Sequence, residues 1–136
     1  MKPIRLTFLL AIALAPALAL APATAGADPV DGMWQTEPDD GNYAHIEMGP
    51  CSGGKVCGWI RRSFDATGEY HGENIGKVLV INMENQGDGS YKGSVWRPSN
   101  DKTYIGKMEL DGDTLELAGC VAGGLLCSSQ TWARVE

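Results

Sequence analysis

The chain has 136 residues, and its 17 acidic and 11 basic side chains give it a formal net charge of −6. Nucleic acids and anionic membrane surfaces bind basic patches, so this acidic composition argues against both as partners. A cationic partner stays open.

Residues 1–27 have the composition of a secretory signal peptide. Two basic residues stand near the start, an apolar stretch runs from Leu6 to Leu20, and small residues follow. A membrane anchor needs about 20 unbroken apolar residues, whereas this stretch is shorter and contains Pro16. We therefore expect no stable membrane anchor, and export to the periplasm or the medium. Cleavage after Ala25 or after Ala27 fits the pattern, and we prefer Ala27.

Residues 28–136 are predicted to form one domain. They carry nine basic and 17 acidic side chains, a formal charge of −8, and their number allows one modest core. Glycine is frequent, and turn residues interrupt short β-rich runs about every ten positions. This pattern is typical of an antiparallel sheet.

Eight strands are predicted. In chain order they are Met33–Thr36, Tyr43–Met48, Lys55–Arg61, Lys77–Met83, Tyr91–Trp96, Thr103–Leu110, Thr114–Cys120 and Leu126–Val135. Short turn sequences such as NQGDGS and RPSND connect them, whereas parallel strands would need crossovers of about a dozen residues. Only the segment Arg62–Gly76 is that long, and its composition predicts a polar loop.

Sequential antiparallel strands of this number either close into a barrel or divide into a sandwich. Closure removes the exposed strand edges that promote aggregation. Gly58, Gly93, Gly106 and Gly119 fall inside predicted strands, where glycine is favourable only if the sheet bends sharply or backbones approach closely. We therefore predict an all-β fold, a small eight-stranded antiparallel up-and-down barrel. A Greek-key sandwich is the alternative.

The four cysteines occur as two close pairs. Cys51 and Cys57 flank one glycine-bearing loop, and Cys120 and Cys127 flank another. In an exported protein this pattern predicts two local disulfides. Zinc is the alternative, but structural zinc sites usually have shorter spacings between paired thiols.

The two ends of the predicted domain carry matching residues. Gly32 and Trp34 begin the first strand, and Trp132 and Arg134 end the last. In an up-and-down barrel these strands are neighbours, so Arg134 is predicted to stack on the indole of Trp34. Gly32 would let the chain pass close to that ring. Trp132 shares a strand face with Arg134 and is a candidate second wall of the cluster.

Gly-x-Trp on the first strand and arginine on the last resemble the calycin signature of lipocalins and their relatives. The longer stretches KVCGWIRR, KVLVINM, YKGSVWRPSNDKTY and GCVAGGLLCSSQTWARV resemble the secreted bacterial family DUF2147. The resemblance covers residues 31–135. It implies a lipocalin-like barrel in the cell envelope, and it implies no particular activity.

The candidate catalytic and metal-binding residues favour neither chemistry. His45 and Glu47 would share a strand face, as metal ligands can, but a solvated face explains them as well. His71 and Glu73 lie in the predicted loop, and the paired carboxylates Asp39/Asp40 and Asp111/Asp113 lie in turns. No serine stands in a Gly-x-Ser-x-Gly turn. We expect a non-enzymatic protein without a cofactor.

Aromatic residues are the remaining candidates for a binding surface: Trp59, Trp96, Tyr43, Tyr70, Tyr91 and Tyr104. The first hypothesis is that the barrel binds a small apolar or amphipathic ligand in one small cavity, open near Arg62–Gly76. A solid, ligand-free interior is the competing interpretation. The second hypothesis is an envelope interaction protein, for instance an inhibitor of a cationic hydrolase such as lysozyme, because acidic charge speeds association with a basic partner.

Overall fold

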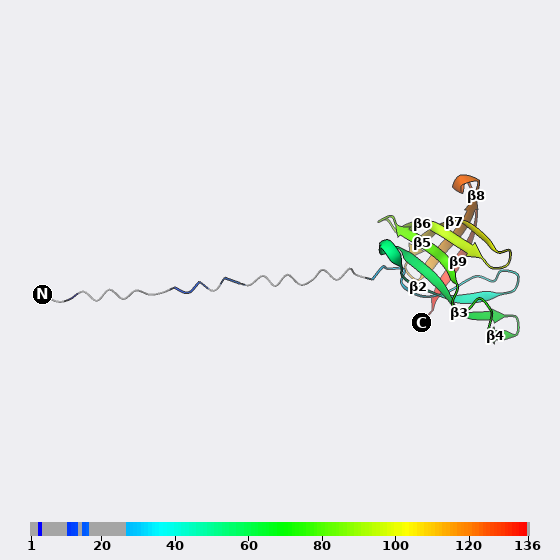
Figure 1. The fold of residues 1–136 in the computed structure, drawn as a ribbon, viewed down its shortest axis with the longest axis horizontal. Coiled ribbons are helices and arrows are strands. Elements are labelled where there is room, and N and C mark those ends of the chain that lie inside the picture. The colour runs from blue at the N-terminus through cyan, green and yellow to red at the C-terminus, as the bar shows by residue number, and fades with distance from the viewer. Residues whose placement is uncertain (1–2, 4–10, 14, 17–26, 136) are drawn as a thin grey trace.

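The computed structural model describes residues 3, 11–13, 15–16 and 27–135 (Figure 1). Most of the predicted signal peptide, including Ala25, lies outside these residues. The helices of the described part are the 3₁₀ turns Ser52–Gly54 (η1) and Ala122–Gly124 (η2), three residues each. Neither has the length and apolar composition needed to cross a bilayer.

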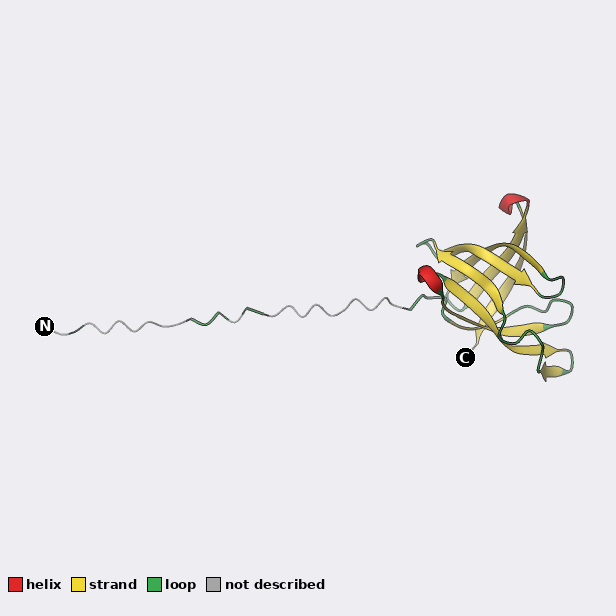
Figure 2. Cartoon of the chain, viewed as in Figure 1, coloured by secondary structure: helices red, strands yellow, loops and turns green. Residues whose placement is uncertain are grey.

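The sheet has nine strands, all antiparallel (Figure 2). They are β1 (Gly32–Gln35), β2 (Tyr43–Pro50), β3 (Val56–Asp65), β4 (Gly68–Tyr70), β5 (Val78–Asn85), β6 (Ser90–Arg97), β7 (Lys102–Asp111), β8 (Thr114–Val121) and β9 (Leu126–Val135). Eight of them follow the order β2-β1-β9-β8-β7-β6-β5-β3, and pairing of β3 with β2 closes the ring. The predicted eight-stranded up-and-down barrel is confirmed.

The loop prediction for Arg62–Gly76 is wrong in its first half. Strand β3 continues to Asp65, and β4 pairs with its end outside the ring. The turn between them is closed by Thr67, whose backbone N–H and hydroxyl both donate to the Asp65 carboxylate. This hairpin stands at the rim with much of its surface in solvent, so its residues lack the apolar alternation that indicates a strand.

Two strand glycines lie where the barrel wall bends or packs most closely. A Cβ on Gly93 would lie 2.7 Å from the carbonyl oxygens of Ile81 and Asn82. The β5–β6 register shifts there, and Asn82 has a positive φ of 49°. A Cβ on Gly58 would lie 2.6 Å from Met48 Sδ. Glycine is therefore needed at both positions, as the prediction of close approach required.

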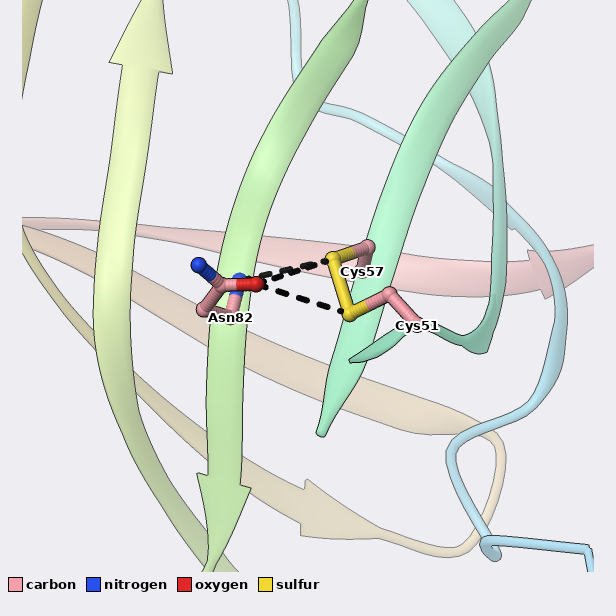
Figure 3. Close-up of a disulfide and its surroundings, with 3 residues drawn as sticks. All are labelled: Cys51, Cys57 and Asn82. Atoms are coloured by element: carbon pink, nitrogen blue, oxygen red, sulfur yellow. Dashed lines mark hydrogen bonds between the residues drawn. A yellow bond between two sulfur atoms is a disulfide. The ribbon is translucent and has the colours of Figure 1, made fainter. Parts of the chain in front are cut away.

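Both predicted cysteine pairs are disulfides in the structure. The Cys51–Cys57 bridge spans the β2–β3 connection, and the Cys120–Cys127 bridge joins β8 to β9. Figure 3 shows Asn82 beside the first bridge. Its backbone N–H donates to Cys57 Sγ, with 3.5 Å between the nitrogen and the sulfur. The bulge in β5 therefore packs against the disulfide.

One end of the barrel, which we call the base, is sealed by residues 28–31. Val30 is fully buried, and its carbonyl accepts a 2.8 Å hydrogen bond from Trp34 Nε1. Tyr91, also buried, donates its hydroxyl proton to Asp28 Oδ1 at 2.6 Å. Burial and this hydrogen bond raise the pKa of Tyr91, so its hydroxyl stays protonated as the donor. The chain entering β1 thus serves as a plug.

Arg134 holds the plug to the last strand. Trp34 and Arg134 are paired across β1 and β9, and the guanidinium carbon lies 4.3 Å from the indole centroid. Its Nη1 donates to the carbonyl of Asp31 at 2.9 Å and its Nη2 to that of Pro29 at 3.0 Å. Its Nε donates to Asp113 at 3.0 Å.

Gly32 makes room for the guanidinium. Its φ is +126°, and a Cβ there would lie 3.0 Å from Arg134 Nη1. The sequence predicted that Gly32 lets the chain pass close to the indole ring. The structure shows instead that the glycine makes room for the Arg134 guanidinium. A side chain at this position would combine backbone strain with displacement of the guanidinium.

We predict that Trp34→Ala and Arg134→Ala each destabilise the barrel and that their effects are coupled. Loss of the buried indole should cost about 3 to 5 kcal/mol, and loss of the arginine less. A double-mutant cycle by urea unfolding should give a coupling of about 1 kcal/mol. Arg134→Lys should recover little, because the ammonium cannot reproduce the three-way guanidinium contacts. Additive effects of the two alanine changes would contradict direct contact.

Candidate ligand-binding cavity

The connections that follow β1, β3, β6 and β8 all lie at the end of the barrel opposite the base, because up-and-down strands alternate in direction. We call this end the mouth. A cavity of about 920 Å³ is lined by residues from all four of these connections or the strand ends beside them. Tyr70 and Asn74 contribute to its lining, so it opens beside the predicted long connection. It is larger than the short strands led us to expect.

The inner wall of the cavity is mainly apolar and comes from strands β3, β5, β6, β8 and β9. Its residues are Ile60, Leu79, Val95, Leu117 and Trp132. These side chains are themselves nearly buried, with Trp132 1% exposed and Leu79 8% exposed. Most of the space that solvent reaches therefore lies toward the mouth. A ligand would lie there, with its apolar part directed at this wall.

The rim of the mouth is polar. It includes Glu37, Asp39 and Asn42 from the β1–β2 connection, and Arg97 and Ser99 from the β6–β7 turn. Polar groups at the opening and apolar groups inside match the two ends of an amphipathic molecule.

An ion pair crosses this mouth. Arg97 Nε and Nη2 donate to the two carboxylate oxygens of Asp39 at 2.8 and 2.7 Å, and the Ser99 hydroxyl donates to Oδ2 at 3.0 Å. Strands β1 and β6 are four places apart in either direction around the eight-stranded ring, so they lie opposite each other. We call this contact the Asp39–Arg97 clasp. The hydrogen bonds from Arg97 are the main cause of the lowered pKa of Asp39.

The aromatic candidates divide between the mouth and other parts of the barrel. Tyr43, Tyr70, Trp96 and Tyr104 line the cavity. Lys77 lies 5.6 Å from the centroid of the Trp96 ring, whose Nε1 donates to Asp101 at 2.8 Å. This fixes the indole at the rim.

The remaining aromatic candidates serve elsewhere. Tyr91 belongs to the base. The ring centroid of Trp59 lies 5.7 Å from the guanidinium carbon of Arg61. Trp132, expected as a second wall of the Trp34–Arg134 cluster, is part of the inner cavity wall and donates to Gln130 at 2.9 Å. The sequence analysis did not predict that Trp132 lines the cavity.

The candidate metal ligands have separate partners. His45 is hydrogen-bonded to Gln35 at 3.0 Å, and Glu47 accepts from Arg61 at 3.3 Å. Burial, together with the charge of Arg62, lowers the pKa of His45 and favours its neutral form. His71 lines a separate surface depression. The described part of the chain contains no group of three or more His, Cys, Asp or Glu residues placed to hold a metal ion.

These elements form a small closed up-and-down β-barrel with a sealed base and an open mouth. The chain belongs to the family described as uncharacterized protein conserved in bacteria (DUF2147), whose model matches residues 32–134. The match begins at Gly32 and ends at Arg134, so it includes every strand of the ring. Comparison with curated proteins and with solved structures gave no significant match.

We predict that Asp39→Asn loosens the mouth without unfolding the barrel. The amides of Asp39 and Asn42, which bond to each other's carbonyls, should exchange hydrogen faster in the variant. The melting temperature should change little, because the clasp is partly exposed. Hydrogen exchange followed residue by residue by NMR checks this.

The same loosening should appear in the unaltered protein at acid pH. A lowered folded-state pKa means that the clasp contributes stability above the ordinary carboxyl value of 3.8 and loses it as pH falls through the folded value. Amide hydrogen exchange in the β1–β2 connection of the unaltered protein should therefore approach the rate seen in Asp39→Asn only below pH 3.8. Both rates are corrected for the pH dependence of intrinsic amide exchange. An equal pH response in the variant would contradict the assignment to Asp39.

Proposed function

We propose that this protein is a lipocalin-like carrier, periplasmic or secreted, that binds one small amphipathic molecule in the barrel mouth. The observation that carries the proposal is the cavity of about 920 Å³, which combines an apolar inner wall with a polar rim. Its volume is in the range of ligand pockets, about 300 to 1,000 Å³. The two disulfides support an oxidising compartment.

The charges at the rim favour a neutral or cationic head group. Glu37 and Asp39 both line the opening, and Arg97, the basic residue in the lining, is already bonded to Asp39. The formal charge of residues 28–136 is −8, so the surrounding field also repels anions. An alcohol or an amine on an apolar chain fits this arrangement better than a carboxylic acid.

The proposed role is binding without catalysis. His45, the histidine that lies on a strand, is half-buried beside the cavity lining and not in it. It is hydrogen-bonded to Gln35, and its ring centroid lies 4.7 Å from that of Phe64. The buried polar residue Ser63 lines the cavity, but its serine hydroxyl would need an activating base. The positions of His45 and Ser63 therefore support a binding protein and not an enzyme.

We predict that dodecanol and dodecylamine bind the protein more tightly than dodecanoate at low ionic strength. Gly119 lines the cavity, and a Cβ there would meet its neighbours at an ordinary 3.5 Å, so the backbone accepts a side chain and Gly119→Leu should extend into the cavity. It should weaken dodecanol binding at least about tenfold, as expected when roughly two buried methylenes are displaced. Displacement of a fluorescent apolar probe gives the affinities.

Ala118→Leu is the matched control. Ala118 is the neighbour of Gly119 on β8 and points to the opposite face, so the added bulk should leave dodecanol binding unchanged. The carrier proposal would be wrong if none of the three compounds bound, or if both leucine variants bound dodecanol as tightly as the unaltered protein.

The acidic surface supports a second candidate, an inhibitor of a cationic hydrolase. Here the charge of −8 would steer association with a basic partner, and the affinity should fall steeply with salt. Titration against lysozyme at low and then physiological ionic strength tests it. Inhibition that persisted in Gly119→Leu would separate this role from ligand binding, whereas no inhibition at low salt would remove lysozyme as the target.

A further inference from the structure

The hairpin formed by β8, η2 and β9 carries an exposed apolar tip. It rises clear of β6 and β7 in Figure 1, with η2 in orange at its end. Leu125 is 85% exposed and Leu126 66%, the highest values among the large apolar residues of 27–135, and Val121 is 49% exposed. We call these three side chains the tip.

The tip is held in this exposed position. The Cys120–Cys127 disulfide joins the two strands directly beside the pair Val121↔Leu126. Lys107 of the neighbouring strand donates to the carbonyl of Gly124 at 3.1 Å. The cross-link and this anchor therefore fix the backbone of the tip at the edge of the mouth.

The tip continues into the cavity wall. The register pairs Val121↔Leu126, Gly119↔Ser128 and Leu117↔Gln130 succeed one another down the hairpin, and all six residues line the cavity. Alternate residues of a strand share one face, so these pairs form a continuous track. The track leads from the exposed tip to Trp132 in the inner wall.

The charge and size of the tip indicate which kind of partner can bind it. Residues 117–133 contain no charged side chain, although residues 28–136 carry a formal charge of −8. Three side chains are also far fewer than the 20 to 30 residues, roughly, that each partner contributes to a stable protein interface. A second copy or a basic protein is therefore poorly matched to this surface. A small apolar projection suits a phospholipid bilayer, whose interior accepts aliphatic side chains of any shape.

We propose that the tip inserts into the surface of a phospholipid bilayer and that amphipathic molecules pass from the bilayer along the track into the cavity. The passage along the track rests on the carrier function proposed above, whereas the insertion does not. Neutral head groups should be the preferred surface, because anionic lipids repel the acidic protein.

Flotation with phosphatidylcholine vesicles tests the insertion. The protein should float with the vesicles, and Leu125→Ser/Leu126→Ser should reduce the partition coefficient at least about tenfold, as expected for loss of two buried leucines. Val78→Ser is the control, since Val78 is 36% exposed on β5, which lies opposite β9 in the ring. It should float like the unaltered protein. Replacing part of the lipid by phosphatidylglycerol should weaken binding at low ionic strength.

Dodecanol binding without vesicles separates this inference from the carrier function. Because Leu125 and Leu126 line the cavity, the double variant is judged by flotation alone, and dodecanol binding is measured on the unaltered protein. Vesicle binding together with no dodecanol binding by the unaltered protein would end the carrier proposal and leave the insertion standing. Failure to float, an equal loss in Val78→Ser, or a dimer abolished by the double variant would overturn the insertion.

Discussion

The contact between Arg134 and Trp34 is the one on which the rest of the barrel depends. Strand β1 has only four residues, and it pairs with β9 at three positions, so the ladder at this seam is short. One guanidinium adds contacts to the indole face, to the carbonyls of Asp31 and Pro29, and to Asp113. Side-chain contacts thus reinforce the seam where the backbone ladder is weakest, and they place the plug at the base.

Sealing the base determines where a ligand can enter. Residues 28–31 fill the end at which β1 begins and β9 ends, and the buried core around Trp34, Tyr91 and Val30 occupies this half. The opposite end receives the connections after β1, β3, β6 and β8, whose rim is polar. The Asp39–Arg97 clasp braces this open end with a partly exposed ion pair, which water and salt can compete with. The base is therefore held by buried contacts, whereas the mouth is braced by a partly exposed ion pair.

The exposed hairpin follows from the same asymmetry. The β8–β9 ladder continues past the ring to Val121 and Leu126, so no third strand covers its final turn. A disulfide and the Lys107 anchor replace the missing neighbours. Apolar side chains that would be buried in the ring are displayed outside it, next to the mouth. Opening and tip lie together because both belong to the same end of an up-and-down barrel.

Much of this fold follows from local patterns. The approximate positions of the eight ring strands, the two disulfides and the Trp34–Arg134 pairing follow from alternation, turn residues, short cysteine spacings and the adjacency of first and last strands. The β3–β4 hairpin gave no such signal, because Ser63, Glu69 and Asp65 do not alternate with apolar residues. Likewise, the close approach of Gly32 to Arg134 could be recognised only from the backbone conformation in the structure.

The sequence by itself determined the antiparallel β architecture and favoured its closure into a barrel, because strand periodicity and turn chemistry depend on residues that are close together in the chain. Only the tertiary structure decided the binding geometry. The clasp joins Asp39 and Arg97 across 58 positions of sequence, and Trp132 lines the same cavity as Ile60 and Leu79 only because the ring closes. Such contacts depend on barrel radius, strand register and shear, which sum small twists over all eight strands. No short stretch of the chain encodes that sum, so the cavity, its rim and the track from the tip appear only in three dimensions.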